Sequence, residues 1–87
     1  MKITKKQQKL IDESFNKVKD QYPEIVFKDL QNSPEDPRDI WINVIANMDE
    51  DREIELRHYS NKIGNEIFFK HGIDIFLYTE NPQKVYA

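Results

Sequence analysis

Side chains able to perform acid–base or nucleophilic chemistry are few and scattered along this chain. Cysteine is absent, which excludes a thiolate nucleophile, a disulfide and a Cys-based zinc site. His58 and His71 lie thirteen positions apart, so they lack the H-x-x-x-H spacing that places two imidazoles on one helical turn for a metal. Glu55, His58 and Ser60 have suitable residue types, but a single helix does not arrange them as a triad. We therefore expect no metal and no cofactor.

Carboxylates are the remaining candidates. Asp39 precedes the apolar run IWINVIA, and Asp74 lies within the run IDIFLYT. Asp36 and Asp39 flank Pro37 in a loop that could hold a cation, although Asp before a strand is more often a turn-forming residue. Whether Asp39 and Asp74 meet depends on how the strands that carry them pair.

Composition indicates an ordinary small globular protein. The 87 residues suit one domain, with 38% hydrophobic and 33% charged side chains. A chain of this size buries only about 60% of its unfolded surface, so we expect a small core and no deep substrate cavity. The N-terminal MKITKKQQKL lacks the apolar segment of a signal peptide, and no run approaches the ~20 apolar residues of a membrane span. We expect a cytoplasmic protein.

Charge is distributed unevenly along the chain. Residues 1–20 carry six Lys against three acidic residues, a net +3, whereas residues 21–87 carry seven basic against thirteen acidic residues, a net −6. A nucleic-acid partner would need the cations of the first helix. These cations are Lys2, Lys5, Lys6, Lys9, Lys17 and Lys19. A lysine-rich helix face is usually only solvated, so the charge pattern argues against nucleic acid and leaves RNA binding through this helix as a third hypothesis.

The first helix is predicted from its end signals and from its apolar spacing. Thr4 with Gln7 fits a capping box, and Pro23 stops the helix. The buried stripe is predicted to be Leu10, Ile11, Phe15, Val18 and Tyr22.

The second helix is predicted to begin at Asp49 or Asn47 and to end near His71, before Gly72. Its buried stripe is predicted to be Leu56, Tyr59, Ile63 and Ile67. Gly64 lies beside this stripe and would permit a close approach to the sheet.

The charged residues at the start of the second helix are interpreted as solvated surface. Four acidic residues alternate with arginines there, so i,i+4 pairs such as Glu53 with Arg57 are expected. A docking role toward a basic partner is the alternative.

Three strands are predicted, at residues 24–30, 39–46 and 73–79. A loop at 31–38 separates the first two, and a tail at 80–87 is either flexible or forms a short helical turn after Asn81. The middle strand is apolar on both faces except for Asn43, which is typical of a central strand. A helical crossover makes the second and third strands parallel, while the short loop makes the first two antiparallel.

These elements predict an α+β fold in the order α-β-β-α-β, forming one domain over residues 1–87. It is a two-layer sandwich in which two helices cover one face of a mixed three-stranded sheet. Alternation puts the aliphatic set under the helices. That set is Ile40, Ile42, Val44 and Ala46 with Ile73, Ile75, Leu77 and Thr79. The opposite, open face then carries Trp41, Asn43, Ile45, Asp74, Phe76 and Tyr78.

The open face is the candidate partner-binding surface. Trp41, Phe76 and Tyr78 supply large ring area with polar groups among them, in particular Asn43, as at interface centres. The alternative is that the tail, with Val85 and Tyr86, folds back over the rings, or that the rings are half-exposed sheet residues without a role. Bases could also stack on the rings, but nearby acids would repel phosphates.

The element order and the DIWINVI strand resemble the minimal core of the nucleotidyltransferase-like fold related to DNA polymerase beta, over residues 5–80. Active members have a Gly-Ser pair after the first strand, a D-x-D on the second and a further Asp on the next, which together hold divalent metal. The first strand here reads FKD at residues 27–29, without Gly-Ser, and Trp41 stands at the second carboxylate. Only Asp39 and Asp74 match. The resemblance implies a lapsed site with residual metal or nucleotide contact at these two residues.

The chain also looks like small bacterial proteins, and a ribosome-maturation-factor or KH-like domain fits the same order of elements. No G-x-x-G loop is present in the sequence, which argues against the KH reading. We predict a non-catalytic interaction module that self-associates or binds another protein through the open sheet face. A lapsed nucleotidyltransferase-like or nucleotide-binding domain is the alternative.

Overall fold

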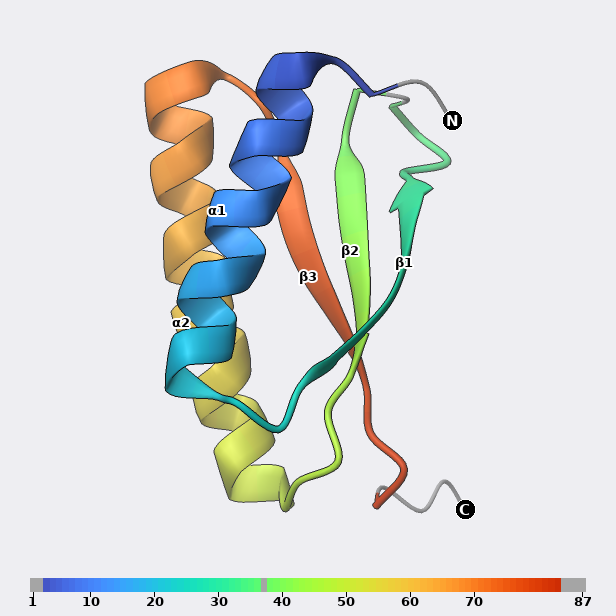
Figure 1. Cartoon of the computed structure of the whole chain (residues 1–87), viewed down its shortest axis with the longest axis vertical. Helices are drawn as coiled ribbons and strands as arrows, with labels where there is room; N and C mark the ends of the chain where they lie inside the picture. The colour runs from blue at the N-terminus through green and yellow to red at the C-terminus, as the bar shows by residue number, and fades with distance from the viewer. Residues whose placement is uncertain (1–2, 37, 84–87) are drawn as a thin grey trace.

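The computed structural model describes residues 3–36 and 38–83. Its elements follow the order α-β-β-α-β, which confirms the predicted α+β class (Figure 1). They are α1 (Lys5–Gln21), β1 (Val26–Asn32), β2 (Ile40–Ile45), α2 (Glu50–His71) and β3 (Ile75–Glu80). In the described part of the chain, no helix has the length and apolar character needed to cross a membrane.

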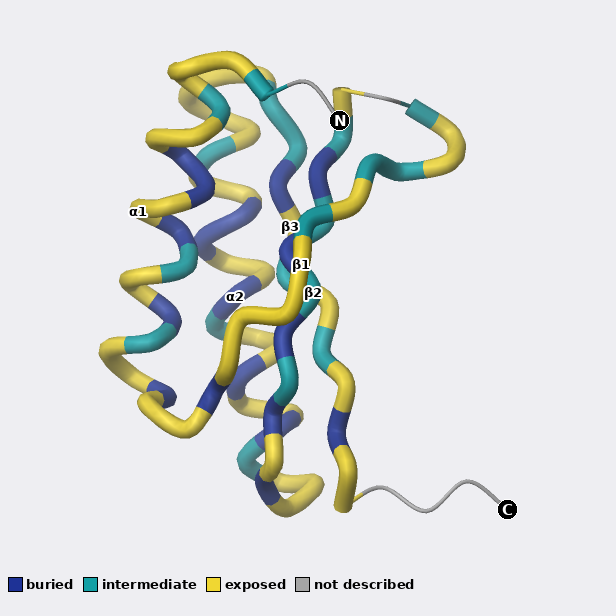
Figure 2. The backbone as a smooth tube through the Cα atoms, turned by 45° about the vertical axis from the view of Figure 1, so that its right-hand side comes forward, coloured by how far each residue is buried: buried dark blue, intermediate teal, exposed yellow. Residues whose placement is uncertain are grey.

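The sheet has the predicted mixed topology with β2 at its centre. β1 pairs with β2 antiparallel and β3 pairs with β2 parallel, in the order β1-β2-β3. Figure 2 shows both helices on one side of the strands. Within residues 3–36 and 38–83, the opposite side of the sheet is therefore free of helices, as the sequence predicts.

The helix ends follow their sequence signals. The Thr4 hydroxyl accepts a hydrogen bond from the Gln7 backbone N–H and the Gln7 side chain accepts one from the Thr4 N–H, which completes the capping box. Of the two candidates for the start of α2, Asp49 is the cap, and its carboxylate accepts from the Arg52 N–H at 2.8 Å. Gly72 ends α2 with a left-handed φ of 67°.

The core lies between the helices and the sheet and contains the predicted aliphatic face. Its buried strand residues are Ile40, Ile42, Val44, Ala46 and Ile75. The helices contribute Leu10, Ile11, Val18, Leu56 and Ile63, with the partly buried Phe15, Tyr59 and Ile67 packed against them. Gly64 is buried against β3, and a Cβ built there would lie 2.9 Å from the Ile75 carbonyl oxygen. This contact confirms the predicted close approach of α2 to the sheet.

The first strand begins and ends two residues later than predicted, at Val26–Asn32 instead of 24–30. A turn after Tyr22, closed by a 3.2 Å hydrogen bond from the Ile25 N–H to the Tyr22 carbonyl oxygen, delays the start. Gln31 and Asn32, predicted as loop, lie opposite residues of β2. Cross-strand pairing extends the strand beyond the point where local β-propensity ends.

The prediction that Glu53 is a solvated residue is wrong. The i,i+4 pair with Arg57 forms at 3.2 Å, but the Glu53 side chain is 2% exposed while that of Arg57 is 48% exposed. Asn81, also buried, donates to the Met48 carbonyl oxygen at 2.8 Å and lies 3.5 Å from Glu53 Oε1. The Glu53 carboxylate is buried because Asn81, which follows β3, packs against the first turns of α2.

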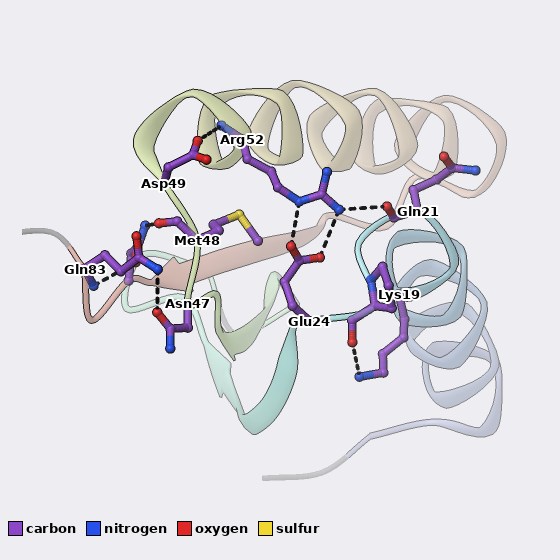
Figure 3. A network of polar contacts seen from close by, with 10 residues as sticks. Lys19, Gln21, Glu24, Asn47, Met48, Asp49, Arg52 and Gln83 are labelled. Carbon is purple, nitrogen blue, oxygen red and sulfur yellow. Dashed lines mark hydrogen bonds and ion pairs between the residues drawn. The ribbon is translucent and has the colours of Figure 1, made fainter.

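Polar contacts connect the two layers near the start of α2 (Figure 3). Arg52 donates to both carboxylate oxygens of Glu24 at 2.6 and 3.0 Å, and its guanidinium lies 4.7 Å from the Tyr22 ring centroid. Gln83 Nε2 donates to Asn47 Oδ1 at 2.9 Å. These contacts fix the loops around the start of α2, away from the centre of the sheet.

In the tail, the Asn81 side chain accepts from the Gln83 N–H at 3.0 Å, which makes a turn and no helix up to residue 83. Any further helical turn falls on residues 84–87. These lie outside the described residues, as do Val85 and Tyr86, which were predicted as an alternative cover of the open face.

Candidate binding site on the open sheet face

The parallel register of β2 and β3 brings the predicted open-face residues together. Trp41 lies opposite Phe76, and Asn43 lies opposite Tyr78. Successive residues of a strand point to opposite faces, and the neighbours Ile40, Ile42 and Ile75 are buried under the helices. Trp41, Asn43 and Tyr78 therefore lie on the face that no helix of the described residues covers. Phe76 lies on the same side of β3, and its ring also approaches α2, since a Cβ built at Gly64 would lie 4.0 Å from Phe76 Cδ1.

The aromatic side chains make a partly exposed cluster. Trp41 and Tyr78 stack diagonally across the two strands, with ring centroids 5.8 Å apart and planes inclined by 10°. Tyr78 is 61% exposed and Phe76 is 38% exposed, whereas Trp41 is partly buried. The Trp41–Tyr78 contact stabilises the arrangement by about 0.5–1.5 kcal/mol beyond area burial and leaves ring surface open to solvent.

A groove runs along this cluster. Its volume is about 370 Å³, and it is lined by Ser33, Asp39, Trp41, Phe76 and Tyr78. Ser33 follows β1 and Asp39 precedes β2, so the polar end of the groove lies where these two strands are connected. We call the groove as a whole the aromatic groove.

Asn43 lies beside the aromatic groove and does not line it. Its amide nitrogen donates to Asp29 Oδ1 at 2.6 Å and to Gln31 Oε1 at 3.2 Å, both on β1. These bonds fix the Asn43 side chain among its cross-strand neighbours. Its predicted role in partner binding stays a prediction.

Asp39 and Asp74 are neighbours, as the parallel pairing of their strands requires. The Ile40 N–H donates to the Asp74 carbonyl oxygen at 2.9 Å, which aligns the starts of β2 and β3. Partial burial, followed by the hydrogen bond and the negative charge of Asp74, raises the pKa of the Asp39 carboxyl. The Arg38 guanidinium donates to Asp36 at 3.0 and 3.2 Å.

The two aspartates do not gain a third ligand for a metal. Within residues 3–36 and 38–83, no group of three or more His, Cys, Asp or Glu side chains is arranged to hold a metal ion. The residual nucleotide or metal role of Asp39 and Asp74 stays a prediction.

A second exposed surface was not predicted. Phe69 is 92% exposed and Phe68 is 52% exposed, at the C-terminal end of α2. A shallow depression of about 570 Å³ follows the outer side of this helix. Its lining residues are His58, Asn61, Lys62, Asn65, Glu66, Phe69 and Lys70. The signal was present in the sequence, because adjacent helix residues point about 100° apart and two consecutive Phe cannot both face one core.

One of the first-helix cations, Lys19, is held by backbone carbonyl groups. Lys19 Nζ donates to the carbonyl oxygens of Pro23 and Ile25, at 3.0 and 2.6 Å, so this lysine belongs to the α1–β1 turn. Lys5, Lys6, Lys9 and Lys17 are exposed, and Lys2 lies outside the described residues.

The chain matches no protein-family model, no curated protein and no solved structure. The resemblance to the nucleotidyltransferase-like fold accordingly rests on the sequence alone.

Proposed function

We propose that this chain is a non-catalytic, cytoplasmic protein-binding module whose binding surface is the open sheet face. The observation that carries the proposal is the solvent-accessible cluster of Trp41, Phe76 and Tyr78 on the side of the sheet without helices. Exposed aromatic surface gains free energy when it is removed from water. A partner that covers these rings would therefore bind favourably.

The chemistry of the face supports a polypeptide as the partner. Tyr and Trp combine large apolar area with a polar group at the ring edge and lose little conformational entropy on binding, which is why they dominate interface hot spots. A polar border surrounds the rings. It includes the Asn43 amide and the Lys28–Glu80 ion pair at 3.0 Å. An apolar centre with a polar rim is the usual anatomy of a protein interface.

A selection experiment tests the proposal without knowledge of the natural partner. A phage-displayed library of random dodecapeptides is selected on the immobilised protein, and the enriched peptides are measured against two variants. Tyr78→Thr removes an exposed ring while keeping a β-favouring residue on β3. Phe69→Ala is the matched control, because it removes a still more exposed ring from α2, on the helical side.

We expect peptides that lose binding to Tyr78→Thr and keep it with Phe69→Ala. Sedimentation equilibrium of the protein alone tests whether the partner is a second copy of this chain. Self-association that is lost in Tyr78→Thr and kept in Phe69→Ala would also support the proposal. Peptides that bind Tyr78→Thr as tightly as wild type, or a monomeric protein that enriches no peptide, would overturn it.

The adjacent carboxylates favour one rival, a nucleotide-binding remnant at Asp39 and Asp74. That function predicts binding of a nucleoside triphosphate in the presence of Mg²⁺, which Asp74→Asn would weaken. Isothermal titration with ATP and Mg²⁺ separates the two functions, since the binding module predicts no heat of binding.

A further inference from the structure

The polar end of the aromatic groove carries negative charge. Asp39 lines the groove together with the three rings, and the parallel strands place Asp74 beside it, since the Ile40 N–H donates to the Asp74 carbonyl oxygen at 2.9 Å. Two neighbouring carboxyl groups repel each other when both are ionised, and burial raises the cost further. A positive charge placed beside Asp39 would relieve both effects.

No ion pair of the described residues includes Asp39 or Asp74. The ion pairs are Lys28–Glu80, Arg38–Asp36, Arg52–Glu24 and Arg57–Glu53. Arg38 is the basic residue nearest in sequence. Its guanidinium holds Asp36 in a two-point contact, and its charge acts on Asp39 and Asp74 from beyond ion-pair distance.

The walls of the groove suit a flat cation. Aromatic faces attract a guanidinium or ammonium group within about 6 Å of the ring centroid, and arginine does so more often than lysine. Tyr78 is 61% exposed and Phe76 is 38% exposed, so ring surface is accessible beside the carboxylate. Arginine also matches the second feature, since its guanidinium forms two parallel hydrogen bonds to a carboxylate while its plane stacks on a ring.

We propose that the aromatic groove binds an arginine side chain of the partner polypeptide, an inference that rests on the proposed function. The guanidinium packs against the rings of Phe76 and Tyr78 and donates hydrogen bonds to the Asp39 carboxylate. Asp74 adds negative charge behind Asp39, and the methylene groups of the arginine cover Trp41. The groove volume of about 370 Å³ accommodates one such side chain with space for neighbouring backbone.

Two changes to one enriched dodecapeptide and one change to the protein test this assignment. The arginine that alanine scanning of the peptide identifies is replaced by citrulline, which keeps the shape and loses the charge, and separately by lysine. On the protein side, Asp39→Asn removes the charge and keeps the size. Glu35→Gln is the matched control, because Glu35 is an exposed carboxylate in the same connection between β1 and β2.

Dissociation constants follow from the quenching of Trp41 fluorescence. We expect citrulline to weaken binding by about ten- to a hundredfold, and Asp39→Asn to weaken it by a similar factor, as for a charge-assisted hydrogen bond. Lysine should give an intermediate loss. Glu35→Gln should leave affinity unchanged. The citrulline peptide should bind wild type and Asp39→Asn equally, because the two changes remove one interaction.

Failure of this inference is distinct from failure of the proposed function. Enriched peptides that depend on Tyr78 but contain no essential arginine, or that bind Asp39→Asn as tightly as wild type, overturn the arginine assignment and leave the open face as the binding surface. Peptides that are insensitive to Tyr78→Thr overturn both.

Discussion

Gly64→Ala tests the packing that places β3 beside β2 and so forms the aromatic groove. Gly64 lies in the interior of α2 and is buried against β3. At an exposed helix position the same change would stabilise the protein by about 1 kcal/mol, because alanine has the highest helix propensity. Here the added Cβ would lie 2.9 Å from the Ile75 carbonyl oxygen.

The contact between the added Cβ and the Ile75 carbonyl oxygen decides whether Gly64→Ala stabilises or destabilises the protein. The atom in the way belongs to the backbone of β3, and β3 is held to β2 on its other side, so it cannot move independently. Inserting a methyl group into a packed site costs about 1–3 kcal/mol. After the gain in helix propensity is subtracted, we expect Gly64→Ala to lower the free energy of unfolding by about 1 kcal/mol. For a domain of this size that corresponds to a fall in Tm of about 4–8 °C.

Urea denaturation followed by Trp41 fluorescence measures the change. Asn65→Ala is the control, because Asn65 is the exposed neighbour on the same helix, and we expect it to stabilise the protein by about 0.5 kcal/mol. A Gly64→Ala protein more stable than wild type would refute the close approach of α2 to Ile75.

Three further predictions concern other parts of the fold. Gly72→Ala should destabilise the protein by about 1 kcal/mol in urea, because Gly72 has a φ of 67°, and an unchanged midpoint would contradict this. Arg57→Ala should cost about 1–2 kcal/mol in the same assay, since it removes a guanidinium from a buried Glu53 carboxylate, and a loss within error would show that the pair contributes nothing. Burial and the neighbouring Asp74 raise the pKa of the Asp39 carboxyl in the folded protein above its value in the unfolded chain. Protonation of Asp39 therefore stabilises the fold: this stabilisation is fully present below the unfolded-state pKa and is lost as the pH rises through the folded-state pKa. Asp39→Asn should therefore raise Tm near neutral pH but not near pH 3, and an equal shift at both would contradict the sign.

The two faces of the sheet could be predicted because alternation in a strand is strict. In each of β2 and β3 the aliphatic residues alternate with aromatic or polar ones. Burial of the aliphatic set, which includes Ile42 and Ile75, therefore places Trp41 and Tyr78 together on the other face. The close approach of α2 to the sheet at Gly64 was also predictable, because a glycine beside a buried helical stripe leaves room for neighbouring backbone.

Features that depend on contacts distant in sequence were not predictable. Glu53 is buried because the end of β3, with Asn81, closes over the start of α2, and its local sequence resembles any solvated acidic helix start. Gln31 belongs to a strand only because Trp41 lies opposite it. The acids beside the rings were predictable from the sequence, whereas the groove that Asp39 lines with Ser33 needed the three-dimensional arrangement.

The most direct test of the open-face proposal is a ¹H–¹⁵N NMR titration of the labelled protein with one enriched dodecapeptide. We expect the largest shift changes at the Trp41 indole N–H and at the amides of Phe76 and Tyr78, with amides around Phe69 unaffected. Changes centred on α2 near Phe69, with the Trp41 indole signal unmoved, would contradict binding at the open sheet face.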